Sequence, residues 1–165
     1  PGRGMGHLLP EALYEAGARA TFLNHAENPM TMTELSKTIA RARELGIETI
    51  ACADSLAEGT AIAAFRPDIL LCEPTDLIGT GKTADDNYTT SIVAKIRSID
   101  PTIGIMIASG ITTADDVYRV VRLGADGSGA TSGILSAPDP AARIMEMAEA
   151  IVRAAAVRNT QGSAA

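Results

Sequence analysis

The segment ILLCEPTDLIGTGKTADD, residues 69–86, places a run of apolar residues ahead of Glu73 and then breaks into a loop that holds two glycines. An apolar run without polar alternation is typical of a parallel strand that is covered on both faces. Glu73 is therefore expected at the carboxyl end of a buried strand. Parallel α/β folds bind their ligands at these strand ends.

Strands and helices alternate on both sides of this segment. The expected strands cover residues 20–26, 47–53, 68–73 and 103–109, with a weak strand at 125–133, and the expected helices cover residues 9–17, 31–46, 55–65, 87–99, 113–124 and 139–157. Parallel neighbours need crossover connections, so the alternation predicts an α/β fold. An open doubly wound sheet and a closed (β/α)8 barrel both fit. Residues 1–157 are expected to form a single domain and residues 158–165 a disordered tail.

Composition and charge narrow the function classes. The 165 residues are 46% hydrophobic and carry a net charge of -6 without a basic cluster, which argues against nucleic acid binding. No apolar run approaches the roughly 18 residues of a membrane span. Cys52 and Cys72 lie within apolar runs, so buried free thiols are favoured over a disulfide. These features predict a cytoplasmic protein that binds neither nucleic acid nor membrane.

Polar and small residues follow each expected strand. They are Asn24, His25 and Glu27, then Asp54, Glu73, Ser109 and Gly110, and finally Thr131, Ser132 and Gly133. Both candidate architectures gather the carboxyl ends of their strands, so these residues are predicted to share one face. The turns at Ser109 and Thr131 lead toward helix starts, whose free N–H groups favour an anion such as phosphate. No metal or cofactor is expected.

Five segments carry a resemblance to a known family: GHLLPEALYEAGA, FLNHAE, CEPTDLIGTGK, IASGIT and DGSGATSGI. Over residues 3 to 155 the chain resembles triosephosphate isomerase in its shorter archaeal form. The resemblance implies a (β/α)8 TIM barrel, of which this chain would cover about strands 4 to 8 with their helices, an incomplete barrel. It also implies an isomerase that interconverts dihydroxyacetone phosphate and glyceraldehyde 3-phosphate, which are small phosphorylated trioses.

The resemblance further implies roles for individual residues. His25 corresponds to the electrophilic histidine of the family and Glu73 to the catalytic base. Residues 74–82 correspond to a lid over the substrate, which we expect to be more mobile than its flanks. The phosphate-contacting positions fall on Gly79, Gly110, Thr131 and Ser132. In such a site a carboxylate moves a proton between adjacent carbons while an imidazole polarises the carbonyl oxygen.

One departure from the family bears on activity. The first strand of the family carries an asparagine and a lysine that hold the substrate, and no stretch of this chain matches it. We therefore expect the activity of the chain alone to be compromised. The alternatives are a non-catalytic partial-barrel protein that binds phosphate or serves as a scaffold, and another phosphate-handling barrel enzyme. Unpaired edge strands would favour association, so a homo-oligomer is expected.

Overall fold

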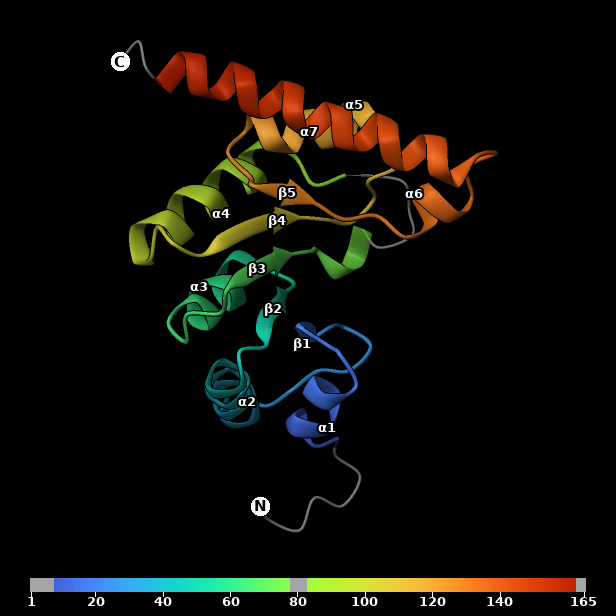
Figure 1. The fold of residues 1–165 in the computed structure, drawn as a ribbon. Coiled ribbons are helices and arrows are strands. Elements are labelled where there is room, and N and C mark those ends of the chain that lie inside the picture. Colours follow the sequence, from blue (N-terminus) through green and yellow to red (C-terminus); the bar gives the residue numbers. More distant parts are fainter. Residues whose placement is uncertain (1–7, 78–82, 163–165) are drawn as a thin grey trace.

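The computed structural model describes residues 8–77 and 83–162 (Figure 1). The strands are β1 (Ala20–Leu23), β2 (Glu48–Ala53), β3 (Ile69–Cys72), β4 (Gly104–Ile107) and β5 (Gly127–Ser128). The helices are α1 (Pro10–Glu15), α2 (Met32–Leu45), α3 (Leu56–Ala63), α4 (Asp86–Ile99), α5 (Ala114–Arg122), α6 (Ser132–Leu135) and α7 (Pro140–Gly162), with a 3-10 turn η1 (Thr75–Leu77) after β3. Every helix and strand predicted from the sequence is present, and α6 is an additional element.

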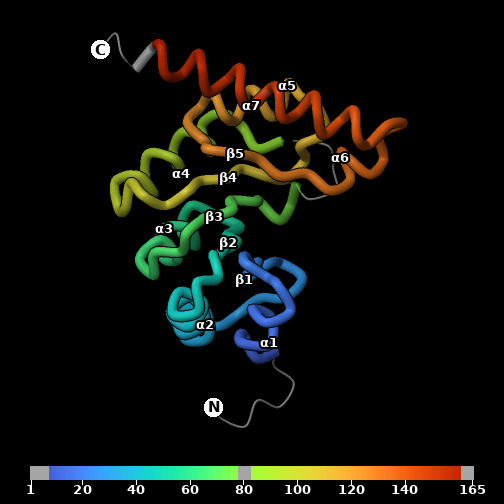
Figure 2. The backbone as a smooth tube through the Cα atoms, in the orientation of Figure 1, coloured from blue at the N-terminus to red at the C-terminus, as the bar shows by residue number. Residues whose placement is uncertain are grey.

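The strands form one five-stranded parallel sheet in chain order, β1-β2-β3-β4-β5. Leu71 of β3, for example, lies opposite Cys52 of β2 and Met106 of β4. A doubly wound sheet reverses its strand order at a switch point, whereas a barrel adds its strands in one direction. The consecutive order therefore selects the barrel type. Within the described residues the barrel is incomplete, and β1 and β5 lie at its two edges (Figure 2).

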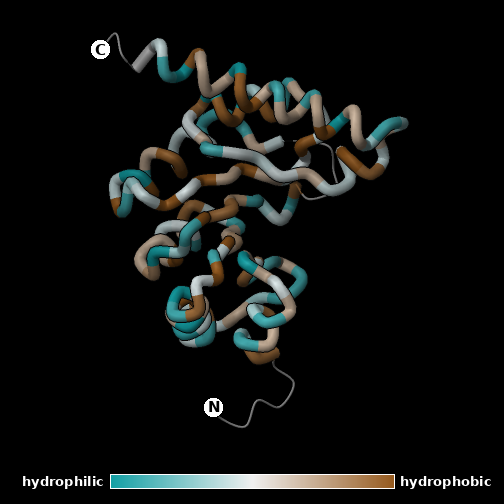
Figure 3. The backbone as a smooth tube through the Cα atoms, in the orientation of Figure 1, coloured by the Kyte–Doolittle hydropathy of each residue, from teal (hydrophilic) through white to brown (hydrophobic). Residues whose placement is uncertain are grey.

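The two faces of the sheet are packed differently. On one face, Leu70 and Ile105 are buried in the main core together with apolar side chains of the helices. On the other face, Cys52, Leu71 and Ala108 form a second, smaller cluster, because successive residues of a strand point to opposite faces. Figure 3 shows hydrophobic positions along β3 and β4, while much of α2 is hydrophilic. The central strands are thus apolar on both faces, as predicted from their sequence.

Local signals set the ends of the helices. The hydroxyl group of Thr31 accepts from the N–H of Glu34, and the Glu34 carboxylate accepts from the N–H of Thr31, which forms a capping box at the start of α2. Gly46 ends this helix in the left-handed conformation, with φ of 72°. Thr113 and Asp116 form the same capping box at the start of α5. These caps fix where the loops after β1 and β4 end.

Two elements differ in extent from the prediction. β5 has 2 residues, fewer than residues 125–133, because glycines at positions 127 and 129 offer no side chain to pack in a strand. The chain instead turns into α6. The last helix continues to Gly162, beyond residue 157, so the described part of the expected disordered tail is helical. Arg158 stabilises this extension by donating to the carbonyl oxygens of Val121 and Ala125.

The longest helix, α7, is a surface helix. It lies along α5 in Figure 1 and buries Met147, Ala150 and Ala154 in the main core. Its opposite side carries exposed residues such as Met145 and Val152. Across residues 8–77 and 83–162, no helix combines the length and the apolar character that a membrane crossing requires.

Candidate active site

The polar residues predicted to form a site lie together at the carboxyl ends of the strands. A pocket of about 840 Å³ opens there, and its lining includes His25, Glu27, Glu73, Ser109, Gly110, Thr131 and Ser132. Because the strands pair in parallel, their carboxyl ends lie on the same side of the sheet, and these residues meet there although they follow four different strands. Gly79, and with it residues 78–82 of the expected lid, lies outside the described residues.

His25 and Glu73 converge across this pocket. The Nε2 atom of His25 lies 3.7 Å from Oε2 of Glu73, and the two side chains are 38% and 17% exposed. This separation is longer than a hydrogen bond. The two side chains thus converge, as expected, without a hydrogen bond between their facing atoms.

The loop after β1 selects the tautomer of His25. The backbone N–H of Glu27 donates to Nδ1 of His25 over 3.2 Å. A ring nitrogen that accepts a hydrogen bond carries no proton, so the neutral imidazole has its proton on Nε2. The backbone N–H of Asn28 also donates to the His25 carbonyl oxygen, over 2.8 Å. The loop thus presents an N–H donor toward Glu73.

The sheet and the loop after β4 support the segment that carries Glu73. The backbone N–H of Glu73 donates to the carbonyl oxygen of Ala53 over 2.8 Å, which extends the β2–β3 ladder past the end of β3. The Oγ atom of Ser109 donates to the carbonyl oxygen of Pro74 over 3.0 Å. Ser109 is buried and adopts a φ of 75°, the left-handed conformation that is uncommon for residues other than glycine. Both contacts restrain the backbone on either side of Glu73.

Close packing joins the two loops that carry the expected phosphate contacts. Gly110 belongs to the loop after β4, and Thr131 and Ser132 lie at the start of α6. A Cβ atom added to Gly133 would lie 2.4 Å from the carbonyl oxygen of Ile111, a distance at which backbone must move. Only a glycine lets α6 approach the loop this closely. The three expected phosphate-contacting residues therefore line one pocket.

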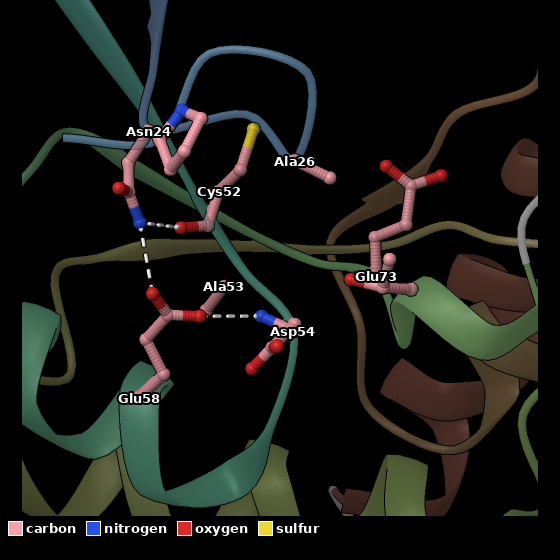
Figure 4. Close-up of a pocket in the computed structure, with 9 residues that line it drawn as sticks. Asn24, Ala26, Cys52, Ala53, Asp54, Glu58 and Glu73 are labelled. Carbon is pink, nitrogen blue, oxygen red and sulfur yellow. Dashed lines mark hydrogen bonds between the residues drawn. The ribbon is translucent and has the colours of Figure 1, made fainter.

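A neighbouring pocket of about 270 Å³ shares Glu73 and contains a contact that the sequence analysis missed (Figure 4). The side-chain amide of Asn24 donates to Oε1 of Glu58 over 3.0 Å, and the backbone N–H of Asp54 donates to Oε2 over 2.8 Å. In the sequence, Glu58 stands three residues after Ser55, a spacing that predicts only a helix cap. No local signal connects Glu58 to Asn24.

The two pockets are acidic. Their described lining includes Glu27, Asp54, Glu58 and Glu73 but no lysine or arginine. Among these lining residues, His25 is the one side chain that can become positively charged. Across the described part of the chain, no three His, Cys, Asp or Glu residues are grouped so that they could hold a metal ion. An anionic ligand held by these residues would depend on His25 and on backbone N–H groups.

Cys52 and Cys72 are free and buried, as predicted. Burial, with smaller contributions from the carboxylates of Glu73 and Glu58, raises the pKa of Cys52 to about 11. Burial likewise raises the pKa of Cys72 to about 12. Both residues stay protonated at neutral pH, so neither supplies a thiolate nucleophile.

Glu73 and His25 form a suitable pair for proton transfer. A carboxylate at a strand end can accept a proton from a carbon atom, and an imidazole N–H can donate to an oxygen on which negative charge develops. This combination suits reactions that begin by removing a proton next to a carbonyl group.

Comparisons with known proteins identify the family of the chain. A family model described as triosephosphate isomerase matches residues 2–151. The triosephosphate isomerase of Sulfurisphaera tokodaii is 35% identical over 137 residues, which cover 82% of this chain and 60% of that protein. That of Methanoculleus marisnigri is 35% identical over 150 residues, which cover 89% of this chain and 68% of that protein. The chain thus spans 60% and 68% of the lengths of these two curated relatives.

Solved structures share the fold at lower sequence identity. Thiamine phosphate pyrophosphorylase from Pyrococcus furiosus has a TM-score of 0.68 and 17% identity, covering 89% of this chain and 66% of that one. The Amycolatopsis orientalis BexX/CysO complex has a TM-score of 0.68 and 16% identity, covering 91% of this chain and 61% of the matched chain. At these identities the similarity concerns the fold alone.

Proposed function

Because the chain belongs to the triosephosphate isomerase family, we propose that it carries the proton-transfer residues of an isomerase acting in glycolysis and gluconeogenesis. The substrates are the small phosphorylated trioses dihydroxyacetone phosphate and glyceraldehyde 3-phosphate. The observation that carries this proposal is the approach of His25 to Glu73, with the hydrogen bond from Glu27 leaving the imidazole proton on Nε2.

In the proposed mechanism, Glu73 is the base. Its carboxylate takes a proton from C1 of dihydroxyacetone phosphate, and the electron pair of that C–H bond forms the C1–C2 double bond of an enediolate. Glu73 then returns the proton to C2, while the hydroxyl proton of C1 passes to the oxygen of C2. The product is glyceraldehyde 3-phosphate, and no atom is gained or lost.

His25 has the second role. Its Nε2–H group donates to the substrate oxygens, which carry more negative charge in the enediolate than in the substrate. A donor placed in advance for such a charge typically contributes about 10² to 10³ in rate. The hydrogen bond from the Glu27 N–H supports this role because it keeps the proton on the required nitrogen.

We propose that the phosphate group is contacted at Gly110, Thr131 and Ser132, and at Gly79, which lies outside the described residues. The first three are supported by their shared pocket with His25 and Glu73. We further propose that the chain on its own turns over slowly, because the described lining of the site has no lysine or arginine to stabilise the enediolate. We also propose that the protein forms a homo-oligomer, since β1 and β5 are edge strands of the described sheet. A location in the cytoplasm is proposed to match the role in glycolysis and gluconeogenesis.

The alternative is a non-catalytic partial barrel that binds phosphate or serves as a scaffold. The observation that favours it is the acidic lining of both pockets, in which His25 is the one described lining side chain able to become positive. Such a protein would keep the family fold without the chemistry.

An isomerase assay on the purified 165-residue chain tests the proposal. The expected result is slow conversion of glyceraldehyde 3-phosphate that exceeds the rate in buffer and that Glu73→Gln lowers by about 10² to 10⁴-fold. Circular dichroism on both proteins controls for folding. A rate equal to that of buffer, unchanged by Glu73→Gln, would favour the scaffold. Full activity would contradict the expected slow turnover of the chain on its own. It would mean that another residue supplies the cation, and Lys82, which lies outside the described residues, would be the first to replace.

A further inference from the structure

We propose that Glu58 is a positioning residue for His25 and acts through the side chain of Asn24. The inference deepens the proposed isomerase and rests on it for the role of His25. Neither Glu58 nor Asn24 carries a role in the chemistry derived above. Hydrogen bonds of the Asn24 side chain with Cys52 and Glu58 tie the loop that carries His25 to the sheet (Figure 4).

The amide of Asn24 joins four parts of the structure. Its Oδ1 atom accepts from the N–H of Met30 over 2.9 Å, at the far end of the loop that begins with His25. Its Nδ2 atom donates to the carbonyl oxygen of Cys52 in β2 over 3.1 Å and to Oε1 of Glu58 in α3 over 3.0 Å. One buried side chain thus connects both ends of the loop after β1 to the neighbouring strand and helix.

The backbone of Asn24 explains why this connection is needed. Asn24 has a φ of 57°, in the left-handed region that costs a residue other than glycine about 1 kcal/mol or more. This conformation turns the chain out of β1 and sets the direction in which His25 leaves the sheet. The hydrogen bonds of the Asn24 amide offset the cost and hold the turn.

The carboxylate of Glu58 makes different contacts from the carboxylates at the third position of α2 and α5. In α2 and α5 the carboxylates at the third helical position, Glu34 and Asp116, return to the backbone N–H of their own N-cap residues. In α3 the N-cap Ser55 accepts from the N–H of Glu58, but the Glu58 carboxylate binds Asn24 and the N–H of Asp54 instead. The charge of Glu58 therefore serves the contact between the β1 loop and β2.

The contact requires a carboxylate. Oε1 of Glu58 faces the Asn24 amide and Oε2 faces the Asp54 N–H, so both oxygens accept from donors. Glutamine has one accepting oxygen, and its NH2 group would face one of these donors. Glu58→Gln keeps the size of the side chain but breaks one of the two contacts. If the contact with Asn24 breaks, the amide is freed directly, and if the contact with Asp54 breaks, the side chain that holds the amide is itself less restrained. In both cases we expect Asn24 to be less restrained and the loop no longer to hold His25 in one arrangement.

Nitrogen NMR of the imidazole ring tests this without any need for turnover. The chain has 2 histidines, so a His7→Gln background leaves His25 as the single reporter. In that background we expect His25 to show one neutral tautomer, with the proton on Nε2, because Glu27 donates to Nδ1. Glu58→Gln should produce a mixture of tautomers, and Asn24→Gly, which tolerates the left-handed backbone, should produce the same mixture.

A matched control separates positioning from general destabilisation. The carboxylate of Asp68 accepts from the N–H of Thr49 over 2.8 Å at the amino end of β2, as Glu58 accepts from Asp54 at its carboxyl end. Asp68→Asn should lower stability to urea without changing the tautomer of His25. Adding Glu58→Gln to Asn24→Gly should cause no further change, since Glu58 acts through Asn24. An unchanged tautomer in Glu58→Gln, or full additivity with Asn24→Gly, would overturn the inference.

The isomerase assay distinguishes this inference from the proposed function. Glu58→Gln should lower kcat by about 10- to 100-fold with little change in KM, because a misplaced catalytic group mainly affects the reaction step. If the chain shows no isomerase activity but Glu58→Gln still disturbs the His25 tautomer, the proposed function fails while the positioning role stands. If activity is present and both the tautomer and kcat are unchanged in Glu58→Gln, the positioning role fails while the proposed function stands.

Discussion

The Nε2 atom of His25 lies 3.7 Å from Oε2 of Glu73, although His25 follows β1, Glu73 follows β3, and β2 lies between these strands. Strands with one neighbour between them are about 10 Å apart. The two side chains therefore lean toward each other across the carboxyl end of β2. A molecule of a few carbon atoms is of a size to contact both.

Replacement of His25 by glutamine should lower isomerase kcat by about 10² to 10³-fold, because the imidazole donor to the enediolate is lost. The measurement is the steady-state rate of each purified variant. His7→Gln is the matched control, since it makes the same replacement at the other histidine of the chain. A loss in His7→Gln as large as that in the His25 variant would contradict the assigned role of His25.

Gly133→Ala should weaken phosphate binding. The added Cβ would approach the carbonyl oxygen of Ile111 to 2.4 Å, so α6 must move away from the loop that carries Gly110. Titration with inorganic phosphate, followed by NMR, should show an affinity lower by about tenfold, the equivalent of one lost contact of about 1.4 kcal/mol.

Gly127→Ala provides the control for this experiment. Its Cβ would lie 3.6 Å from Cγ of Met106, which is an ordinary contact, and Gly127 is not among the residues that line the pocket. The phosphate affinity of this variant should therefore match that of the wild type. Equal affinities in the wild type and in both alanine variants would show that the packing of Gly133 does not support the phosphate site.

Cys52 should react slowly with iodoacetamide in the folded protein. Its pKa is raised to about 11, first by burial and then by Glu73 and Glu58, so little thiolate is present at pH 8. A Cys72→Ala background isolates its reaction for mass spectrometry. The rate should rise steeply from pH 8 toward pH 10, and urea should increase it at pH 8. Equal rates in the folded and unfolded chains would rule out this protection.

Asp116 should contribute stability that is lost in acid. Partial burial acts to raise the pKa of Asp116, but hydrogen bonds from Thr112 and Thr113 outweigh it, and the net pKa is lowered from 3.8. A lowered pKa in the folded state stabilises the protein above the ordinary pKa, and this contribution disappears as the pH falls through the folded-state pKa. Asp116→Asn should therefore cost about 1 kcal/mol at neutral pH and progressively less in acid.

Urea unfolding between pH 7 and pH 3 measures the difference between wild type and the Asp116→Asn variant. Asp115→Asn, in the same first turn of α5 but exposed, controls for the interaction of a carboxylate with the helix dipole. A difference between wild type and Asp116→Asn that stayed constant over this pH range would mean that the charge of Asp116 is not the stabilising feature.

Local signals in the sequence were sufficient for the elements and for much of the site. Apolar runs located the central strands, Thr31 and Gly46 marked the ends of α2, and Glu73 stood directly after an apolar strand. Such features act over a few residues, through side-chain burial, capping and backbone preference, so they can be interpreted without knowing the fold. The weak strand at 125–133 was shorter than predicted because its glycines leave its extent to tertiary packing.

The sequence by itself thus determined the α/β class, the order of the elements and the strand ends on which His25 and Glu73 lie. The tertiary structure decided the strand order, the distance between these two side chains, and the contact of Glu58 with Asn24. The close approach of Gly133 to Ile111 belongs to the same group. These features join residues far apart in the chain, and their geometry depends on how whole strands and helices pack, which periodicity and capping signals do not encode.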